Sequence, residues 1–176
     1  MTTNTTEAAC NLFIRRWGEM AASWGVSRTM AEIHALLFLS TEPLCTDDVM
    51  EKLAVSRGSA STNLRELVKW GLIQRVHQRG DRKEYFLAET DVWAMFEIIM
   101  RERRRREVEP IIETIQKCVS MLEQDPGKHD PAQLEACRQR LSDMLSFFEL
   151  FNQAFNLMAA SGLKGMRTMM QAASSS

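Results

Sequence analysis

Residues 55–64 read VSRGSASTNL and place small polar side chains at the start of an expected helix. Serine, threonine and asparagine are mediocre helix formers, and Gly58 costs a helix interior about 1 kcal/mol relative to alanine. The next residues, LRELVKW, return to leucine and long side chains. Such a segment is either a frayed surface helix or a helix whose outer face offers short hydrogen-bonding side chains to something outside the protein.

The polar and apolar side chains of this segment separate on two sides of one helix. Ser56 is suited to cap its start, and Gly71 is suited to end it. The spacing of Ala60, Leu64 and Leu67 predicts an inward stripe. At about 100° per residue, the opposite side collects Gly58, Ser61, Thr62, Arg65 and Lys69, with Asn63 between the two faces.

The surrounding segments predict a winged helix-turn-helix. Upstream, apolar residues at helical spacing over 10–24 end at Gly25, a second helix follows Ser27, and a third begins with Thr46 as its cap. Downstream, LIQRVHQ and KEYFLAE indicate two short strands joined by a turn at residues 79–82. Helices followed by a hairpin in this order make 55–71 the recognition helix and the hairpin the wing.

Charge is concentrated in the same region. Residues 55–83 hold seven basic and two acidic side chains, a net charge of +5, which leaves −6 for the rest of a chain whose total is −1. A basic patch on a nearly neutral protein is typical of a site for a polyanion such as nucleic acid.

These features predict contacts to double-stranded DNA. Hydroxyl groups can bind phosphates or bases, arginine can bind guanine through two parallel hydrogen bonds, and glycine allows close backbone approach. The expected contacts from the helix are Ser56, Arg57, Gly58, Ser59, Ser61, Thr62, Asn63, Arg65 and Lys69, and those from the wing are Arg79, Arg82 and Lys83. Asp81 would pair with a nearby arginine or shape the turn. The alternative is an ordinary solvated helix face and turn.

The C-terminal half reads as helix. Thr90 or Asp91 is suited to cap DVWAMFEIIM, and the run RERRRRE at 101–107, with a local charge of +3, would contact DNA backbone or form a solvated bridge, which we favour. Pro110 would kink the helix or begin a new one. An apolar seam follows the last long helix, a pattern suited to a partner helix or subunit: Leu134, Cys137, Leu141, Met144, Phe148, Phe151, Phe155 and Met158.

The stretches LAVSRGSASTNLRELVKWGLI and RGDRKEYFLAETDVWAMF resemble the winged-helix repressors of the MarR superfamily, and in particular its GbsR-like branch. The resemblance covers roughly residues 25–100, and the run GDRKEYF at 80–86 is its most specific part. It implies a homodimeric transcriptional regulator whose recognition helix enters the major groove. It also implies a small-molecule effector, with osmoprotectant genes as the regulated set and choline or glycine betaine as the signal.

An effector with a quaternary ammonium group would need an aromatic cage. Trp17, Trp24, Trp93 and Phe96 could supply its walls, although each lies on an apolar helical stripe where core packing is the commoner role. The identity of the effector stays open.

Other classes of function find little support. The three histidines have no catalytic or metal-binding spacing, and no nucleophile elbow, phosphate loop or zinc-protease motif occurs, so we expect no enzyme, no metal and no cofactor. The four cysteines are expected to be buried thiols. No long apolar run and no secretory signal is present, which favours a cytoplasmic protein without membrane contact.

The sequence therefore predicts a mainly α fold with a small β-hairpin, a winged helix-turn-helix flanked by long dimerisation helices. The expected parts are an N-terminal helix at 1–25 in the dimer or effector region, a DNA-binding domain at 26–90, a helical dimerisation region at 91–170 and a disordered tail at 171–176. We expect a ligand-responsive repressor on a pseudo-palindromic operator. The alternatives are a helical protein-interaction module and a DNA-binding thiol sensor that uses Cys10 or Cys118.

Overall fold

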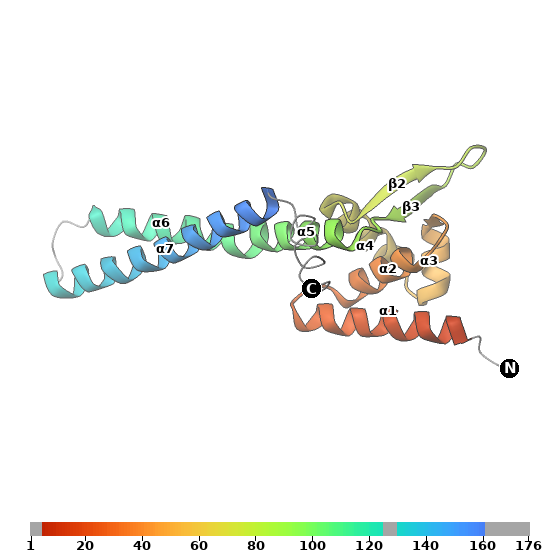
Figure 1. The fold of residues 1–176 in the computed structure, drawn as a ribbon, viewed down its shortest axis with the longest axis horizontal. Helices are drawn as coiled ribbons and strands as arrows, with labels where there is room; N and C mark the ends of the chain where they lie inside the picture. The colour runs from red at the N-terminus through yellow and green to blue at the C-terminus, as the bar shows by residue number, and fades with distance from the viewer. Residues whose placement is uncertain (1–4, 125–129, 161–176) are drawn as a thin grey trace, which may run out of the picture. The chain divides into compact units, whose positions relative to one another are not determined.

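The computed structural model describes residues 5–124 and 130–160, and the expected tail at 171–176 lies outside them. Its elements along the chain are α1 (Thr5–Ser23), α2 (Arg28–Leu39), β1 (Leu44–Cys45), α3 (Thr46–Leu53), α4 (Arg57–Trp70), β2 (Ile73–His77), β3 (Glu84–Ala88), α5 (Val92–Arg103), the π-helical turn η1 (Arg104–Val108), α6 (Glu109–Glu123) and α7 (Pro131–Ala160). The chain divides after Ile98 into two compact units (Figure 1). The mainly helical fold with a small hairpin is confirmed.

The first unit is a winged helix. Helix α1 packs along α2, and α2 contacts both α3 and α4 (Figure 1). The core side chains Ile33, Leu37, Val49, Leu64 and Leu67 are each less than 2% exposed. They come from α2, α3 and α4, so the inward stripe expected of the recognition helix packs on the two preceding helices.

Local signals set the ends of these helices as predicted. The Ser27 side chain accepts a hydrogen bond from the Met30 backbone N–H at 3.3 Å, and Ser56 accepts one from that of Ser59 at the same distance. Gly25 and Gly71 have φ of +77° and +84°, conformations that glycine adopts without steric cost. For α3 the predicted cap was wrong by one residue, because Cys45 holds the N-cap position.

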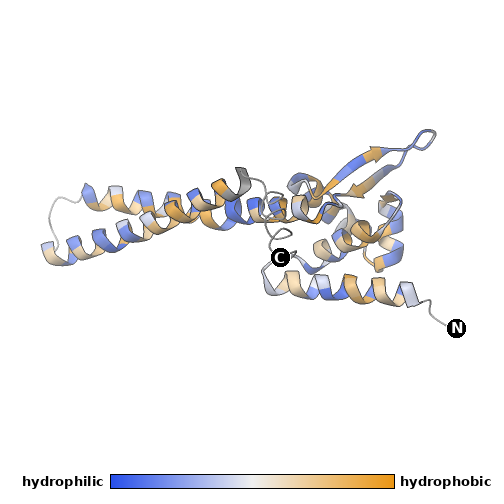
Figure 2. Cartoon of the chain, viewed as in Figure 1, coloured by the Kyte–Doolittle hydropathy of each residue, from blue (hydrophilic) through white to orange (hydrophobic). Residues whose placement is uncertain are grey.

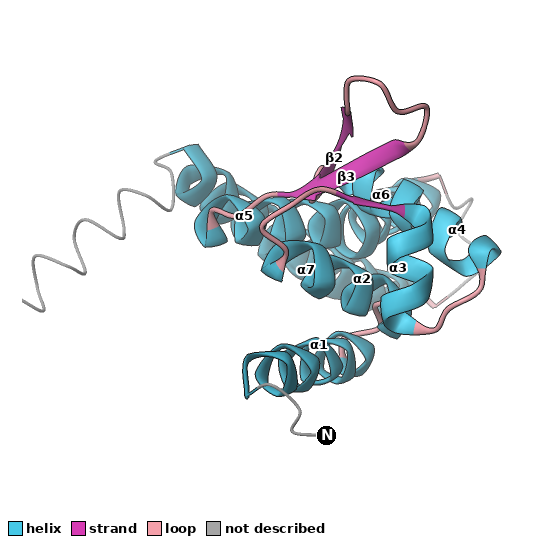
Figure 3. Cartoon of the chain, turned by 90° about the vertical axis from the view of Figure 1, so that its right-hand side faces the viewer, coloured by secondary structure: helices cyan, strands magenta, loops and turns pink. Residues whose placement is uncertain are grey.

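The predicted hairpin is confirmed, and it belongs to a three-stranded antiparallel sheet in the order β1-β3-β2. Strand β3 pairs with β2 from Ile73 opposite Ala88 to His77 opposite Glu84. The sequence analysis missed β1, whose two residues pair with Phe86 and Tyr85 of β3. The hairpin loop projects away from the helices of this unit (Figures 1 and 3).

The second unit is an antiparallel pair of helices, α6 and α7, preceded by the π-helical turn. Pro110 lies in the first turn of α6, directly after the π-helical turn, and the backbone from α5 to α6 stays helical, so the chain meets this proline with a local π distortion and not with a break. Among the described residues of α7, the half-buried side chains are Leu134, Leu141, Leu145, Phe148, Asn152 and Phe155. The predicted seam is therefore divided, since Cys137, Met144 and Phe151 are exposed.

The arginine-rich run is not wholly a solvated bridge, and that expectation was partly wrong. Arg104 donates hydrogen bonds to the side-chain oxygens of Asn152 and Asn156 on α7, and its guanidinium carbon lies 5.2 Å from the Phe155 ring centroid. Glu102 is only 8% exposed and pairs with Arg105 at 2.8 Å. Polar partners on α7 and within the run pair with these charges, although the Arg104 Nε has no hydrogen-bond partner among the described residues. No helix within the described ranges is long and apolar enough to cross a membrane.

Candidate nucleic-acid interface

Helix α4 presents the polar face that its sequence pattern predicted. Ala60, Leu64, Leu67 and Trp70 are buried beneath it. On the outer side Gly58, Thr62, Arg65 and Lys69 are exposed, while Ser59 and Ser61 are half-buried. A Cβ placed on Gly58 would meet no atom within 4 Å, so the space beside this backbone is open to an incoming ligand.

Two of the residues expected at this interface also serve the protein itself. The Asn63 amide donates to the Ser59 carbonyl oxygen at 2.9 Å, and its oxygen accepts a bond from the Ser27 hydroxyl at 3.4 Å. Asn63 thereby ties the recognition helix to the start of α2. Ser56 is occupied as the N-cap of α4. Any contact of these two side chains with DNA would compete with an intramolecular bond.

The outward cations of α4 differ in how firmly they are held. The Arg65 guanidinium donates only to the Ser61 carbonyl oxygen, at 3.2 Å, and forms no ion pair with a described residue. Lys69 lies 3.9 Å from the Glu66 carboxylate, at the limit of an ion pair. Arg65 is thus the cation of this helix that can turn most readily to an external anion.

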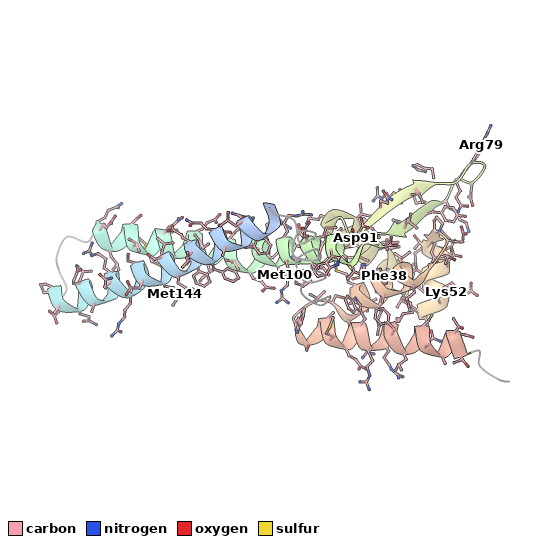
Figure 4. The ribbon with its side chains drawn as sticks, in the orientation of Figure 1. Phe38, Lys52, Arg79, Asp91, Met100 and Met144 are labelled. Carbon is pink, nitrogen blue, oxygen red and sulfur yellow. The ribbon has the colours of Figure 1, made fainter. Side chains whose placement is uncertain are left out.

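The wing carries Arg79 and Arg82 at its exposed tip, where neither forms an ion pair with a described residue. Figure 4 shows Arg79 at the far end of the hairpin, pointing away from the helices. Gly80, with φ of +91°, allows the tight turn. The tip therefore offers two cations on a projecting hairpin.

Asp81 shapes this turn. Its carboxylate accepts hydrogen bonds from the Lys83 backbone N–H at 3.0 Å and from the Tyr85 hydroxyl at 2.7 Å. These bonds hold the pKa of Asp81 below its usual value, and the bond to Asp81 raises the pKa of the Tyr85 hydroxyl. Of the two roles considered for Asp81, these contacts match turn shaping, and neither of them is to an arginine side chain.

Asp47 is a feature of this surface that the sequence analysis did not find. Asp47 and Asp48 lie in the first turn of α3, where the helix dipole favours negative charge, and that position gives no sign of a further role. In the structure the Asp47 carboxylate binds the guanidinium of Arg57 and, at 3.2 Å, the ammonium of Lys83. One carboxylate on α3 thus joins the first residue of the recognition helix to the loop end of the wing, where Lys83 precedes β3. No sequence spacing signals such a three-element contact.

Of the four aromatic residues considered for an effector cage, one lines the cavity that the described residues form beside His34. Trp17 lines a cavity of about 240 Å³ in the first unit, together with Phe13, His34, Ala35, Phe38, Val92 and Met95. Trp24, Trp93 and Phe96 are not among its lining residues, and Trp24 and Phe96 are 52% and 44% exposed. The cavity is thus formed by α1, α2 and the start of α5, with Phe38 labelled in Figure 4.

His34 is the titratable group of this cavity. It is 3% exposed, its ring lies between those of Trp17 and Phe38 with both centroids at 6.3 Å, and its Nε2 has no hydrogen-bond partner among the described residues. Burial lowers the pKa of this imidazole to about 4. Sequence reasoning missed His34 because a histidine on an apolar stripe has no distinguishing signal.

Possible metal ligands and the cysteine thiols were compared in the described part of the chain. Within the described ranges, no three His, Cys, Asp or Glu side chains come together as metal ligands. All four cysteines are free thiols, with Cys45 buried, Cys137 exposed, and Cys10 and Cys118 between these extremes. The expectation that all four are buried was therefore wrong.

The fold and its basic outer face define a winged helix-turn-helix protein. Residues 24–84 match the sequence model of the MarR family. The winged-helix part of this chain is thus similar to the MarR family, and the similarities of the chain include the repressor GbsR.

Named relatives are similar to this chain over part of its length, and a solved structure shares its fold. The chain is 26% identical over 124 residues to the HTH-type transcriptional repressor GbsR of Bacillus subtilis (strain 168). The aligned residues make up 70% of this chain and 68% of that protein. It is 32% identical over 94 residues to the HTH-type transcriptional regulator MmpR5 of Mycobacterium tuberculosis, covering 53% of this chain and 55% of that protein. A crystal structure of a transcriptional regulator shares the fold, with a TM-score of 0.56, 22% identity, and 85% of this chain and 99% of that chain covered.

Proposed function

We propose that this protein binds double-stranded DNA sequence-specifically and represses transcription from the site it occupies. The observation that carries the proposal is the joint exposure of Arg65 on α4 and of Arg79 and Arg82 on the wing, none in an ion pair with a described residue. Helix α4 would read base edges in the major groove, and the wing would reach the adjacent minor groove, whose negative potential favours cations.

The proposed regulator is a homodimer on a pseudo-palindromic operator. Large apolar side chains remain exposed on α6 and α7, among them Ile111, Met121, Met144, Phe147, Leu150, Phe151 and Leu157. A second copy of the chain would cover them. Two recognition helices would then meet half-sites about 34 Å apart, one helical turn of DNA.

The cavity beside His34 is the proposed effector site. The similarity of the chain to the GbsR-like branch extends the proposal to osmoprotectant genes, with choline or glycine betaine as the signal. The lining offers the aromatic rings of Phe13, Trp17 and Phe38 to a quaternary ammonium group but no charged side chain to a carboxylate. Choline, which has no carboxylate, therefore fits this lining better than glycine betaine does. Calorimetric titration with both compounds tests this order.

The decisive experiment for DNA binding is selection from random-sequence duplexes at two salt concentrations, followed by sequencing of the bound fraction. An enriched inverted repeat whose affinity falls steeply with salt supports the proposal. Weak binding without an enriched motif would contradict it and favour the protein-interaction module.

A variant of the wing tests the second half of the interface. Replacing both Arg79 and Arg82 by alanine should flatten the dependence of log K on log salt by about 1.8, if each cation neutralises one phosphate. An unchanged salt dependence would mean that the wing is only a solvated turn.

A further inference from the structure

The contacts of Asp47 differ from those of the other acidic residues on the basic face. Its carboxylate, 44% exposed, binds Arg57, whose side chain is 66% exposed, and Lys83, whose side chain is 54% exposed. Glu66 and Glu84 each approach one cation, at 3.9 and 3.7 Å. Asp47 is thus the described carboxylate that holds two of the expected DNA-contacting cations at once.

The two cations come from the two parts of the proposed interface. Arg57 is the first residue of the recognition helix α4, and Lys83 immediately precedes strand β3 of the wing. DNA phosphates that run between a recognition helix and its wing would pass between these elements. All three side chains are accessible to such a phosphate, because each is about half exposed or more.

We propose that Asp47 is an internal counterion that occupies, in the absence of DNA, the place of a backbone phosphate between Arg57 and Lys83. The inference rests on the proposed DNA binding. A phosphate must displace the carboxylate from these cations or share them with it, so Arg57 and Lys83 contribute less to binding than unpaired cations would. Asp47 weakens binding to every sequence, because phosphates carry no sequence information.

Asp47 affects the recognition of bases less than it affects the phosphate contacts. Arg65 points from a different part of α4 and has no contact with Asp47 among its hydrogen bonds. Asp47 would therefore lower affinity for the operator and for random DNA by the same factor, and it sets the strength of the phosphate contacts without contacting a base. Hydrogen bonds from Lys83 and then from Arg57 hold the pKa of Asp47 below its usual value, so the carboxylate remains charged at neutral pH.

The test compares the salt dependence of DNA binding for four forms of the full chain. These are the wild type, Asp47→Asn, Asp47→Glu and Glu51→Gln. Glu51 lies exposed on the same helix and forms no ion pair with a described residue, so its variant matches the charge change without releasing a cation. Affinity is measured on random-sequence duplex and on the selected operator between 50 and 200 mM salt.

For Asp47→Asn we expect tighter binding to both duplexes and a steeper salt slope, by about 0.9, as for one additional neutralised phosphate. Its gain on random duplex should then be about 3.5-fold larger at 50 mM than at 200 mM salt. Its ratio of operator to random affinity should stay at the wild-type value, because phosphate contacts carry no sequence information. Asp47→Glu and Glu51→Gln should keep the wild-type slope.

Two results would overturn the inference. Weaker binding by Asp47→Asn would show that the carboxylate only positions its cations, and a slope equal to that of Glu51→Gln would show that no phosphate replaces it. Thermal unfolding of each variant verifies that the fold is intact. If the wild type itself shows no salt-dependent binding, the proposed DNA binding fails instead.

Discussion

The two units of this protein bury their apolar side chains to very different degrees. In the winged-helix unit, Ile33, Val49 and Ala60 are fully buried, with 0% exposure. Among the described residues of the second unit, only Glu102 and Ile115 are buried. The first unit therefore contains a core of its own, whereas the helix pair α6–α7 must complete its core elsewhere.

The second unit exposes apolar side chains that a partner would cover. Apolar residues recur along α6 and α7 in Figure 2, and Met144 projects outward from α7 in Figure 4. Phe147 and Leu150 are 62% and 67% exposed, values unusual for side chains of this size. Contiguous exposed apolar surface marks an interaction site, so the comparison predicts that the second unit is stabilised by a second copy.

The largest effect is expected from charging this surface. The double variant Phe147→Glu/Leu150→Glu should raise the dimer dissociation constant by on the order of 1000-fold, if each side chain contributes at least about 2 kcal/mol as an interface anchor. Sedimentation equilibrium measures the constant. Gln153→Glu, an exposed substitution on the same helix, is the control. A wild-type chain that is monomeric at tens of micromolar would contradict the prediction that a second copy covers the apolar surface of the second unit.

A second prediction concerns the buried imidazole of the first unit. In the unfolded chain His34 takes up a proton near its ordinary pKa of 6.5, whereas in the folded protein it does so only near pH 4. Between these values the unfolded state binds more protons, so the stability of the fold decreases as the pH falls from 6.5 to 4. The full loss is about 3 kcal/mol, because a pKa that differs by one between the folded and unfolded chain corresponds to about 1.4 kcal/mol.

Urea unfolding at pH 7, 5.5 and 4.5 measures this loss. His34→Phe keeps an aromatic ring between Trp17 and Phe38 and should flatten the pH dependence. His77→Gln removes an exposed histidine and should leave it unchanged. A wild-type stability that does not change over this range would show that His34 is hydrated in solution.

The sequence predicted most of the first unit because its signals are local. Caps such as Ser27 and Ser56 and glycines such as Gly25 and Gly71 act within one turn of their own helix. Strand β1 was missed because its two residues become a strand only by pairing with β3, about forty residues later. Pairing across that distance leaves no periodic pattern.

The site was predicted unevenly for the same reason. Exposed residues such as Arg65, Arg79 and Arg82 follow from helical periodicity and turn position. The Asp47 contacts and the Asn63 contact to Ser27 join elements that only the tertiary fold brings together. In the second unit, the side-chain hydrogen bonds of Arg104 depend on asparagines of α7 that lie 48 and 52 residues further along the chain.

A third prediction tests the outer face of the first unit without touching its core. Arg65→Ala should weaken operator binding by about 1–3 kcal/mol and relax the preference at one base pair, if Arg65 contacts a base. Competition with single-base operator variants measures this preference. Equal weakening on all sequences would identify a phosphate contact instead. Thr62→Ala, on the same exposed face, gives the effect of losing a smaller polar group.

The smallest effect is expected from the N-cap of α4, which stabilises the first unit alone. Ser56→Ala removes the side-chain acceptor that caps α4 and should destabilise the first unit by about 1 kcal/mol, whereas Ser56→Asp should restore the cap. Ser61→Ala, whose hydroxyl has no hydrogen bond to a described residue, should cost little. Urea unfolding followed by tryptophan fluorescence reports on the first unit, because all four tryptophans of the chain lie in it and Trp70 is only 5% exposed. If the dimer dissociation constant changed as well, the two units would be coupled more tightly than their separate cores imply.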